Sequence, residues 1–283
     1  MKDSDISVIH KGRFCLIQLI RGDALGCPKI VKWIPCEEPS KCYPPARTEQ
    51  HSSLSAGTSS QLPQNKLPTE CRINQKLQHE NIVKFIGLLR DVNAIGIVME
   101  YLERGSLASA PITMTFAHDQ IWAYLEGMMS GLSYMHNNNI VHRDINPNNL
   151  LLTDDDQIKI SDFGLSEEVQ EDTELTGTIG TPQYLAPECV QEPSKPYKGK
   201  PVDVWASGMT LYWMIYRENY YEDEDKYCIF QQIQTQPVQL NKQMIGERFY
   251  CILKRLLKSN PIDRPSAIQM KQDIQNGHPV ANE

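Results

Sequence analysis

The second half of the chain carries a series of short motifs, and their order constrains the fold more than any other feature of the sequence. VHRDINPNNLLL (141–152) is followed by KISDFGLS (159–166) and by GTPQYLAPE (180–188). DVWASG (203–208) and DRP (263–265) complete the series. Each motif alone is short enough to arise by chance, but the ordered set at this spacing is specific.

Composition indicates a globular chain that is long enough to bury a full core, with 40% hydrophobic and 22% charged residues. The net charge of −7 argues against a general binder of nucleic acids or anionic membranes. No apolar run reaches the roughly 20 residues that cross a bilayer, and the N-terminus lacks the apolar core of a signal peptide. We therefore expect a cytoplasmic protein, with the nucleus left open. The cysteines form no C-x-x-C pair that would suggest a zinc site, and in a reducing compartment we expect most of them to be free thiols.

The residue pattern changes along the chain. Residues 6–20 and 28–34 are rich in β-branched residues and predict strands of an antiparallel sheet. Residues 37–66 are dominated by proline, serine, glutamine and threonine, which predicts a disordered loop. Helical spacing prevails after residue 104, beginning with the long amphipathic stretch 118–139.

The motif series resembles the signature set of the protein kinases, and the resemblance covers nearly the whole chain apart from the polar loop. It implies the α+β, two-lobed protein-kinase fold, with a β-rich N-lobe and a helical C-lobe. One domain would span 1–283, with an N-lobe at 1–100 that contains the polar insertion 37–66, a hinge at 101–104 and a C-lobe at 105–283. The resemblance also implies ATP and Mg²⁺ in the cleft between the lobes, and protein substrates.

Phosphoryl transfer requires that phosphates be placed, their charge neutralised and the acceptor hydroxyl oriented. By resemblance, Asp144 is the catalytic aspartate that accepts the substrate proton, and Asn149 and Asp162 are the magnesium ligands. Lys32 matches the phosphate-binding lysine, with Lys29 as a rival that fits the pattern less well. The further residues expected around ATP are Ile9, Gly12, Ile17, Met99, Glu100, Leu102 and Leu151.

Other positions match the family's structural and regulatory residues. Glu70 would pair with Lys32, Glu188 with Arg264, and Asp203 would brace the catalytic loop. The Gly-Thr-x-x-Tyr pattern around Thr181 is typical of serine/threonine kinases, with transfer to tyrosine as the alternative. The structural or regulatory set implied by the resemblance is Arg143, Phe163, Gly164, Thr181, Glu188, Asp203 and Arg264.

Three departures from the kinase pattern raise an alternative function. The glycine-rich loop reads HKGRFCLI at 10–17 and keeps only Gly12, so close approach of the backbone to phosphates is hindered. Asn146 stands where the catalytic loop carries a lysine, and Asn74 where the helix of Glu70 carries an apolar residue. A pseudokinase that acts as a scaffold or allosteric partner is therefore the alternative to an active enzyme.

Within the kinases, the chain is most similar to the calcium/calmodulin-dependent protein kinase kinases. The evidence is the position of the insertion and the segments at 98–120 and 197–212. The resemblance implies that substrates are the activation loops of downstream kinases. Calmodulin as a partner is not supported, because the end of the chain contains no basic amphipathic helix.

The activation segment is unusually acidic. Kinases with an arginine before the catalytic aspartate, here Arg143, often need a phosphate on this segment. Its carboxylates could neutralise Arg143 without phosphate, or they could form a solvated surface run. The acids are Glu167, Glu168, Glu171, Asp172 and Glu174.

Overall fold

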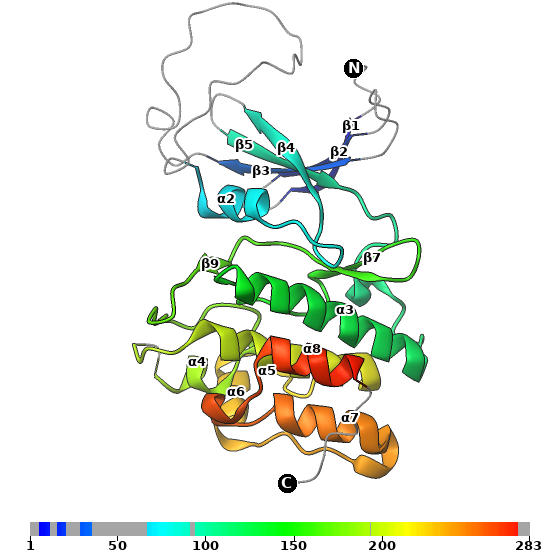
Figure 1. Cartoon of the computed structure of the whole chain (residues 1–283), viewed down its shortest axis with the longest axis vertical. Helices are drawn as coiled ribbons and strands as arrows, with labels where there is room; N and C mark the ends of the chain where they lie inside the picture. The colour runs from blue at the N-terminus through cyan, green and yellow to red at the C-terminus, as the bar shows by residue number, and fades with distance from the viewer. Residues whose placement is uncertain are drawn as a thin grey trace, which may run out of the picture. The chain divides into compact units, whose positions relative to one another are not determined.

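The computed structural model describes residues 6–11, 16–20, 29–35, 67–90, 94–192 and 194–276. It divides into two compact units. The first comprises Met1–Gln78 and Val83–Tyr101, and the second comprises His79–Ile82 and Leu102–Glu283 (Figure 1). The predicted polar insertion and Gly12 lie outside the described residues.

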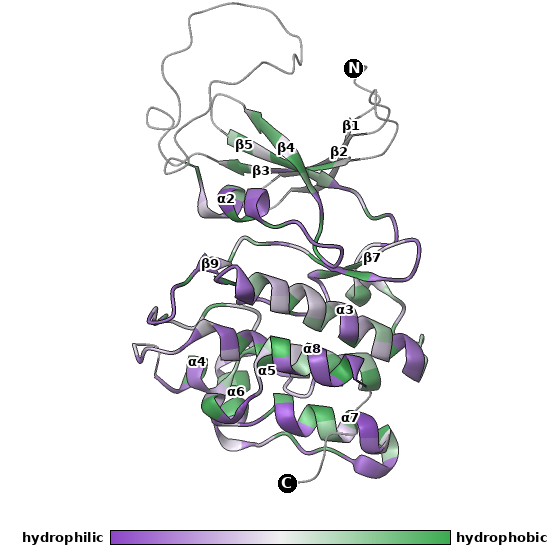
Figure 2. Cartoon of the chain, viewed as in Figure 1, coloured by the Kyte–Doolittle hydropathy of each residue, from purple (hydrophilic) through white to green (hydrophobic). Residues whose placement is uncertain are grey.

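The first unit is built on a five-stranded antiparallel sheet with the strand order β1-β2-β3-β5-β4. The register places Lys32 of β3 opposite Ile17 of β2 and Ile97 of β5. Figure 2 shows hydrophobic residues along β4 and β5, as expected for strands that pack on a core. The strands are β1 (Ile6–Lys11), β2 (Leu16–Ile20), β3 (Lys29–Pro35), β4 (Phe85–Arg90) and β5 (Ala94–Glu100).

A single helix of the described part of the first unit, α2 (Thr69–Lys76), packs against this sheet. Pro68 occupies its N-cap position, Glu70 lies in its first turn and Lys76 in its last, so both charges complement the helix dipole. Cys71 of α2 forms a buried cluster with Leu67, Ile95 and Ile97. This cluster packs α2 against β5 of the sheet.

The second unit is mostly helical. Its two longest helices, α3 (His118–Asn137) and α5 (Gly199–Tyr216), contact each other, and α8 packs on α3. Nearly every turn of α5 is buried on all sides, which is typical of a helix in the centre of a core. The other helices are α4 (Pro187–Gln191), α6 (Lys226–Thr235), α7 (Lys242–Leu256), α8 (Ala267–Gln275) and the 3₁₀ turns η3 (Leu107–Ser109), η4 (Pro182–Tyr184) and η5 (Pro261–Asp263).

Two short antiparallel ladders position the loops of the second unit. Strand β6 (Ile140–Val141) pairs with β9 (Glu167–Glu168), and β7 (Leu150–Leu152) pairs with β8 (Ile158–Ile160). The loop between β6 and β7 contains the VHRDINPNN motif, so both of its ends are fixed by a ladder. A strand-rich first unit and a helical second unit confirm the α+β kinase fold expected from the sequence. In the described part of the chain, no helix combines the length and apolarity that a membrane span requires.

Candidate active site

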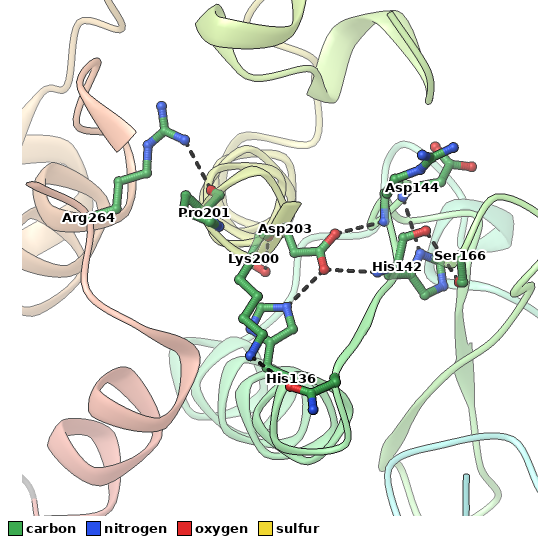
Figure 3. Close-up of polar contacts among 11 residues, drawn as sticks. His136, His142, Asp144, Ser166, Lys200, Pro201, Asp203 and Arg264 are labelled. Atoms are coloured by element: carbon green, nitrogen blue, oxygen red, sulfur yellow. Dashed lines mark hydrogen bonds and ion pairs between the residues drawn. The ribbon is translucent and has the colours of Figure 1, made fainter. Parts of the chain in front are cut away.

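The loop that follows β6 is held by one buried carboxylate. Asp203 of α5 is fully buried and accepts hydrogen bonds from the backbone N–H groups of His142 (2.9 Å) and Arg143 (2.7 Å). It also accepts one from Nε2 of His136 on α3, at 2.9 Å (Figure 3). Arg143 has a left-handed backbone with φ of 65°, an unfavourable conformation that these bonds stabilise. Two helices and the loop therefore converge on Asp203.

Asp144 follows Arg143, and its carboxylate is held on both sides. Its Oδ1 atom accepts hydrogen bonds from the backbone N–H of Thr181 (2.9 Å) and from the Thr181 hydroxyl (2.7 Å). Its Oδ2 atom accepts one from Nδ2 of Asn149 at 2.9 Å. The segment that contains Thr181 reaches this close because Gly180 has φ of 122°, and a Cβ there would lie 2.6 Å from the carbonyl oxygen of Arg143. The structure thus brings Thr181, Asn149 and Asp144 together.

Asn146 is almost fully buried and bonds within the loop. Its Nδ2 atom donates to the carbonyl oxygen of Asp144 (3.0 Å) and to the Thr181 hydroxyl (3.2 Å), and its Oδ1 atom accepts from the backbone N–H of Asn148 (2.9 Å). The side chain therefore joins the loop to the Thr181 segment. Asn146 occupies the catalytic-loop position where kinases carry a lysine, and its expected role in catalysis stays a prediction.

The Asp-Phe-Gly segment lies beside the loop. The backbone N–H of Ser161 donates to the carbonyl oxygen of Asn149 at 2.8 Å, which places Asp162 directly after this contact. Asp162 has a left-handed backbone, with φ of 61°, and its Oδ1 atom accepts from the N–H of Gly164 at 3.2 Å. Phe163 is buried, and its ring packs edge-on against the ring of His142 with centroids 5.5 Å apart.

The residues of this region fit a divalent cation such as Mg²⁺. The amide nitrogen of Asn149 donates to two oxygen atoms of Asp144, and its amide oxygen takes no part in these two bonds. With the carboxylate of Asp162, this makes a set of hard oxygen donors. Among the described residues no three His, Cys, Asp or Glu side chains form a metal-holding group. Mg²⁺ is usually held by one or two carboxylates together with water and phosphate oxygens, so this sparse set is sufficient.

In the first unit, the structure brings Lys32 and Glu70 together. Nζ of Lys32 lies 2.7 Å from Oε1 of Glu70, and both side chains are largely buried, with 14% and 12% exposed. Lys29 lies three positions earlier on β3, opposite Glu100. Asn74 is buried one turn after Glu70, and its Nδ2 atom donates to the Glu70 carbonyl oxygen at 2.9 Å. Its Oδ1 atom has no partner among the described residues.

The remaining expected nucleotide contacts are distributed over both units. Met99 and Glu100 end β5, and the N–H and carboxylate of Glu100 bond to the backbone of Lys84. Leu151 lies on β7 of the second unit, and Leu102 begins the main segment of that unit. Ile9 and Ile17 lie on β1 and β2, but their side chains, like Gly12, are outside the described part of the structure.

A buried ion pair lies away from the loop. Both Nη atoms of Arg264 donate to the two carboxylate oxygens of Glu188, at 2.6 and 2.8 Å, and the Arg264 side chain is fully buried. Arg264 also donates to the Pro201 carbonyl oxygen at 3.0 Å, as Figure 3 shows. The pair joins the Ala-Pro-Glu motif to the start of α5.

Comparison with known proteins identifies the class of this fold and site. The family model described as the protein kinase domain matches residues 52–274, so the chain belongs to the protein kinase family.

Among individual proteins, the chain is 32% identical over 256 residues to a calcium/calmodulin-dependent protein kinase kinase of Caenorhabditis elegans, covering 84% of this chain and 47% of that protein. It is 34% identical over 210 residues to a protein of Dictyostelium discoideum named a probable serine/threonine-protein kinase, covering 71% and 29%. A carbon catabolite-derepressing protein kinase of Candida glabrata is 30% identical over 210 residues, covering 74% and 34%. The chain thus spans less than half the length of these relatives.

The local sequence does not predict two contributors to the site. One is His136, whose bond to Asp203 joins α3 to α5. The other is Thr181, for which the sequence predicts a role in specificity and the structure adds two hydrogen bonds to Asp144. The bond to His136 depends on how α3 and α5 pack, and the local sequence carries no signal for it.

Proposed function

We propose that this protein kinase transfers the γ-phosphoryl group of ATP to serine or threonine residues of other proteins, with Mg²⁺ as cofactor. The observation that carries the proposal is the carboxylate of Asp144, held by Thr181 on one oxygen and by Asn149 on the other. A fixed carboxylate can orient a substrate hydroxyl and accept its proton, which is the role of the base in phosphoryl transfer.

The other residues have roles that follow from their chemistry. Mg²⁺ would be held by Asn149 and Asp162 and would neutralise phosphate charge. Lys32, oriented by Glu70, would contact the α- and β-phosphates. The serine/threonine assignment is supported by the Thr181 hydroxyl on Asp144 and by the names of the relatives. Activation loops of downstream kinases are the proposed substrates, by similarity to a protein named a kinase kinase.

The test is a transfer assay with labelled ATP, Mg²⁺ and an array of serine-, threonine- and tyrosine-containing peptides, including activation-loop sequences. We expect labelled phosphoserine or phosphothreonine from the wild type and none from Asp144→Asn or Asp162→Asn, with circular dichroism showing that both variants are folded. Phosphotyrosine as the main product would contradict the residue specificity. Labelling of generic peptides but not activation-loop peptides would contradict the substrate class.

The pseudokinase alternative is supported by Asn146, which supplies no charge for the γ-phosphate, and by the sequence of the glycine loop. It predicts no transfer by the wild type. Thermal stabilisation by ATP, with and without Mg²⁺, separates a pseudokinase that binds nucleotide from one that does not.

A further inference from the structure

Arg143 is a buried cation whose guanidinium group is already engaged. Its side chain is 10% exposed, and its Nε atom donates to the carbonyl oxygen of Leu165 at 2.9 Å. Its Nη1 atom donates to Oε2 of Glu167 at 2.6 Å. A largely buried cation is costly unless it is paired, and the carboxylate of Glu167 supplies the opposite charge.

Glu167 belongs to a short strand that is paired with the start of the loop of Arg143, and its side chain is 46% exposed. Glu167 lies on β9, opposite Val141 of β6 in the ladder, and Val141 is two residues before Arg143. The backbone pairing therefore fixes the carboxylate beside the arginine. Glu171, Asp172 and Glu174 are exposed, and in the described part of the chain none of these three forms an ion pair with Arg143.

The rest of the activation segment is also ordered through its own bonds. Leu175 and Tyr197 exchange two backbone hydrogen bonds, at 2.9 and 2.8 Å. The Tyr197 hydroxyl donates to the Gly177 carbonyl oxygen at 2.9 Å, and the Thr178 hydroxyl donates to that of Cys189 at 2.8 Å. All of these hydrogen bonds form between unmodified residues, so none of them depends on a phosphate group.

Many kinases order this segment by phosphorylation, because a phosphate pairs with arginine and fixes the loop. We propose that Glu167 is a positioning residue that takes the place of such a phosphate on Arg143, so that the chain reaches its active arrangement without phosphorylation of the activation segment. The expected effect on the rate of transfer rests on the proposed function. The expected effect on the order of the activation segment rests only on the contacts described above.

Glu167 would act on Asp144 indirectly, by holding Arg143 in place. Arg143 is adjacent to Asp144, and its backbone N–H is bound by Asp203 while its carbonyl oxygen lies against Gly180. Glu167 fixes the side chain of the same residue. Loss of the carboxylate would leave a buried cation beside the catalytic aspartate and weaken the contact of the Thr181 segment with it.

The experiment compares the wild type with Glu167→Gln, Glu167→Asp and the matched control Glu174→Gln, an exposed acid of the same segment. Each protein is treated with phosphatase and shown by intact mass to carry no phosphate. Initial rates are measured with the best peptide of the array and quenched before self-phosphorylation. Amide hydrogen exchange of residues 163–180 is measured on the same samples without nucleotide.

We expect the wild type and Glu174→Gln to transfer phosphate without a lag. In Glu167→Gln, kcat should fall about tenfold, the rate equivalent of one charge-assisted hydrogen bond, while KM for ATP stays within about twofold. Glu167→Asp, which keeps the charge, should recover part of the rate. Exchange across 163–180 should accelerate in Glu167→Gln and not in Glu174→Gln.

A wild type that is active only after phosphate enters Thr173, Thr176 or Thr178 would overturn the inference and leave the proposed function standing. Equal rates for Glu167→Gln and the wild type would also overturn it. If the wild type transfers no phosphate in any state, the proposed function fails. The exchange data then decide the inference: unchanged protection in Glu167→Gln contradicts it, and lost protection supports it.

Discussion

Thr181 holds the carboxylate of Asp144 by two hydrogen bonds to the same oxygen atom, one from its backbone N–H and one from its hydroxyl. The hydroxyl also accepts a hydrogen bond from the side chain of Asn146. The segment that precedes the Ala-Pro-Glu motif is therefore bonded directly to the loop that carries Asp144 and Asn146.

Replacement of Thr181 tests this relationship. Thr181→Val keeps the shape and the backbone bond but removes the hydroxyl, so Asp144 loses one of its bonds and Asn146 loses an acceptor. We expect kcat to fall by about ten- to a hundredfold, the rate equivalent of one or two hydrogen bonds, with little change in KM for ATP. Thr181→Ser, which keeps the hydroxyl, should stay within a few-fold of the wild type. An unchanged kcat in Thr181→Val would show that the backbone bond alone suffices.

Asp203→Asn should destabilise the second unit strongly. The carboxylate accepts three hydrogen bonds and is fully buried, and an amide would direct a donor at an N–H group. We expect a loss of about 3 kcal/mol or more in the free energy of unfolding, measured by urea denaturation. The matched control is Asp155→Asn at an exposed aspartate, which should leave the free energy within about 0.5 kcal/mol.

Substitutions in the buried ion pair of Arg264 and Glu188 should destabilise the protein much more than a substitution in a surface ion pair. Arg264→Lys cannot reproduce the bidentate contact inside the core, and Glu188→Gln leaves a buried cation unpaired. Each should lower the free energy of unfolding by about 3–5 kcal/mol. Lys242 and Glu247 form an exposed pair, so Glu247→Gln should leave the melting temperature unchanged. Similar losses of stability in Glu188→Gln and Glu247→Gln would contradict the expectation that the buried pair contributes more to stability than the exposed pair.

His79 makes the stability of the second unit depend on pH. Desolvation by burial lowers its pKa from the ordinary value of 6.5; the charge of Glu80 opposes this shift, and that of Lys271 adds to it. Its Nδ1 atom accepts a hydrogen bond from the backbone N–H of Asn81 at 3.0 Å, which requires the neutral ring. The unfolded chain therefore binds the proton more tightly, so stability is complete above pH 6.5 and falls as the pH drops toward the lowered folded pKa.

The measurement for His79 is the free energy of unfolding between pH 5 and 8, for the wild type and for His79→Asn, whose side-chain oxygen can also accept from a nearby N–H. We expect the variant to have a smaller slope below pH 6.5. If the free energy of unfolding changes with pH equally steeply in the variant and in the wild type, groups other than His79 cause the pH dependence.

The ordered motifs were sufficient to predict the α+β kinase fold, because each motif specifies a short loop at a fixed position between elements. They also selected Asp144, Asn149 and Asp162, whose roles stay predictions, as does the cytoplasmic location. Contacts set by the packing of distant elements were not predictable. The acidic run offered five carboxylates for Arg143, and only the β6–β9 register shows that Glu167 is the one beside it. The bonds of Asn146 likewise depend on where the Thr181 segment lies.

The convergence of two helices and a loop on Asp203 has a consequence for how the chain folds. Asp203 lies 67 residues after His136 and 61 residues after His142, and its single carboxylate is bonded to both. The final conformation of the loop with Asp144 depends on a contact with α5, since its left-handed residue Arg143 is stabilised by Asp203 of that helix. Contacts between distant segments form late because chain entropy must be lost before they are gained. We therefore expect the loop of Asp144 to be among the last parts of the second unit to reach its final conformation during folding.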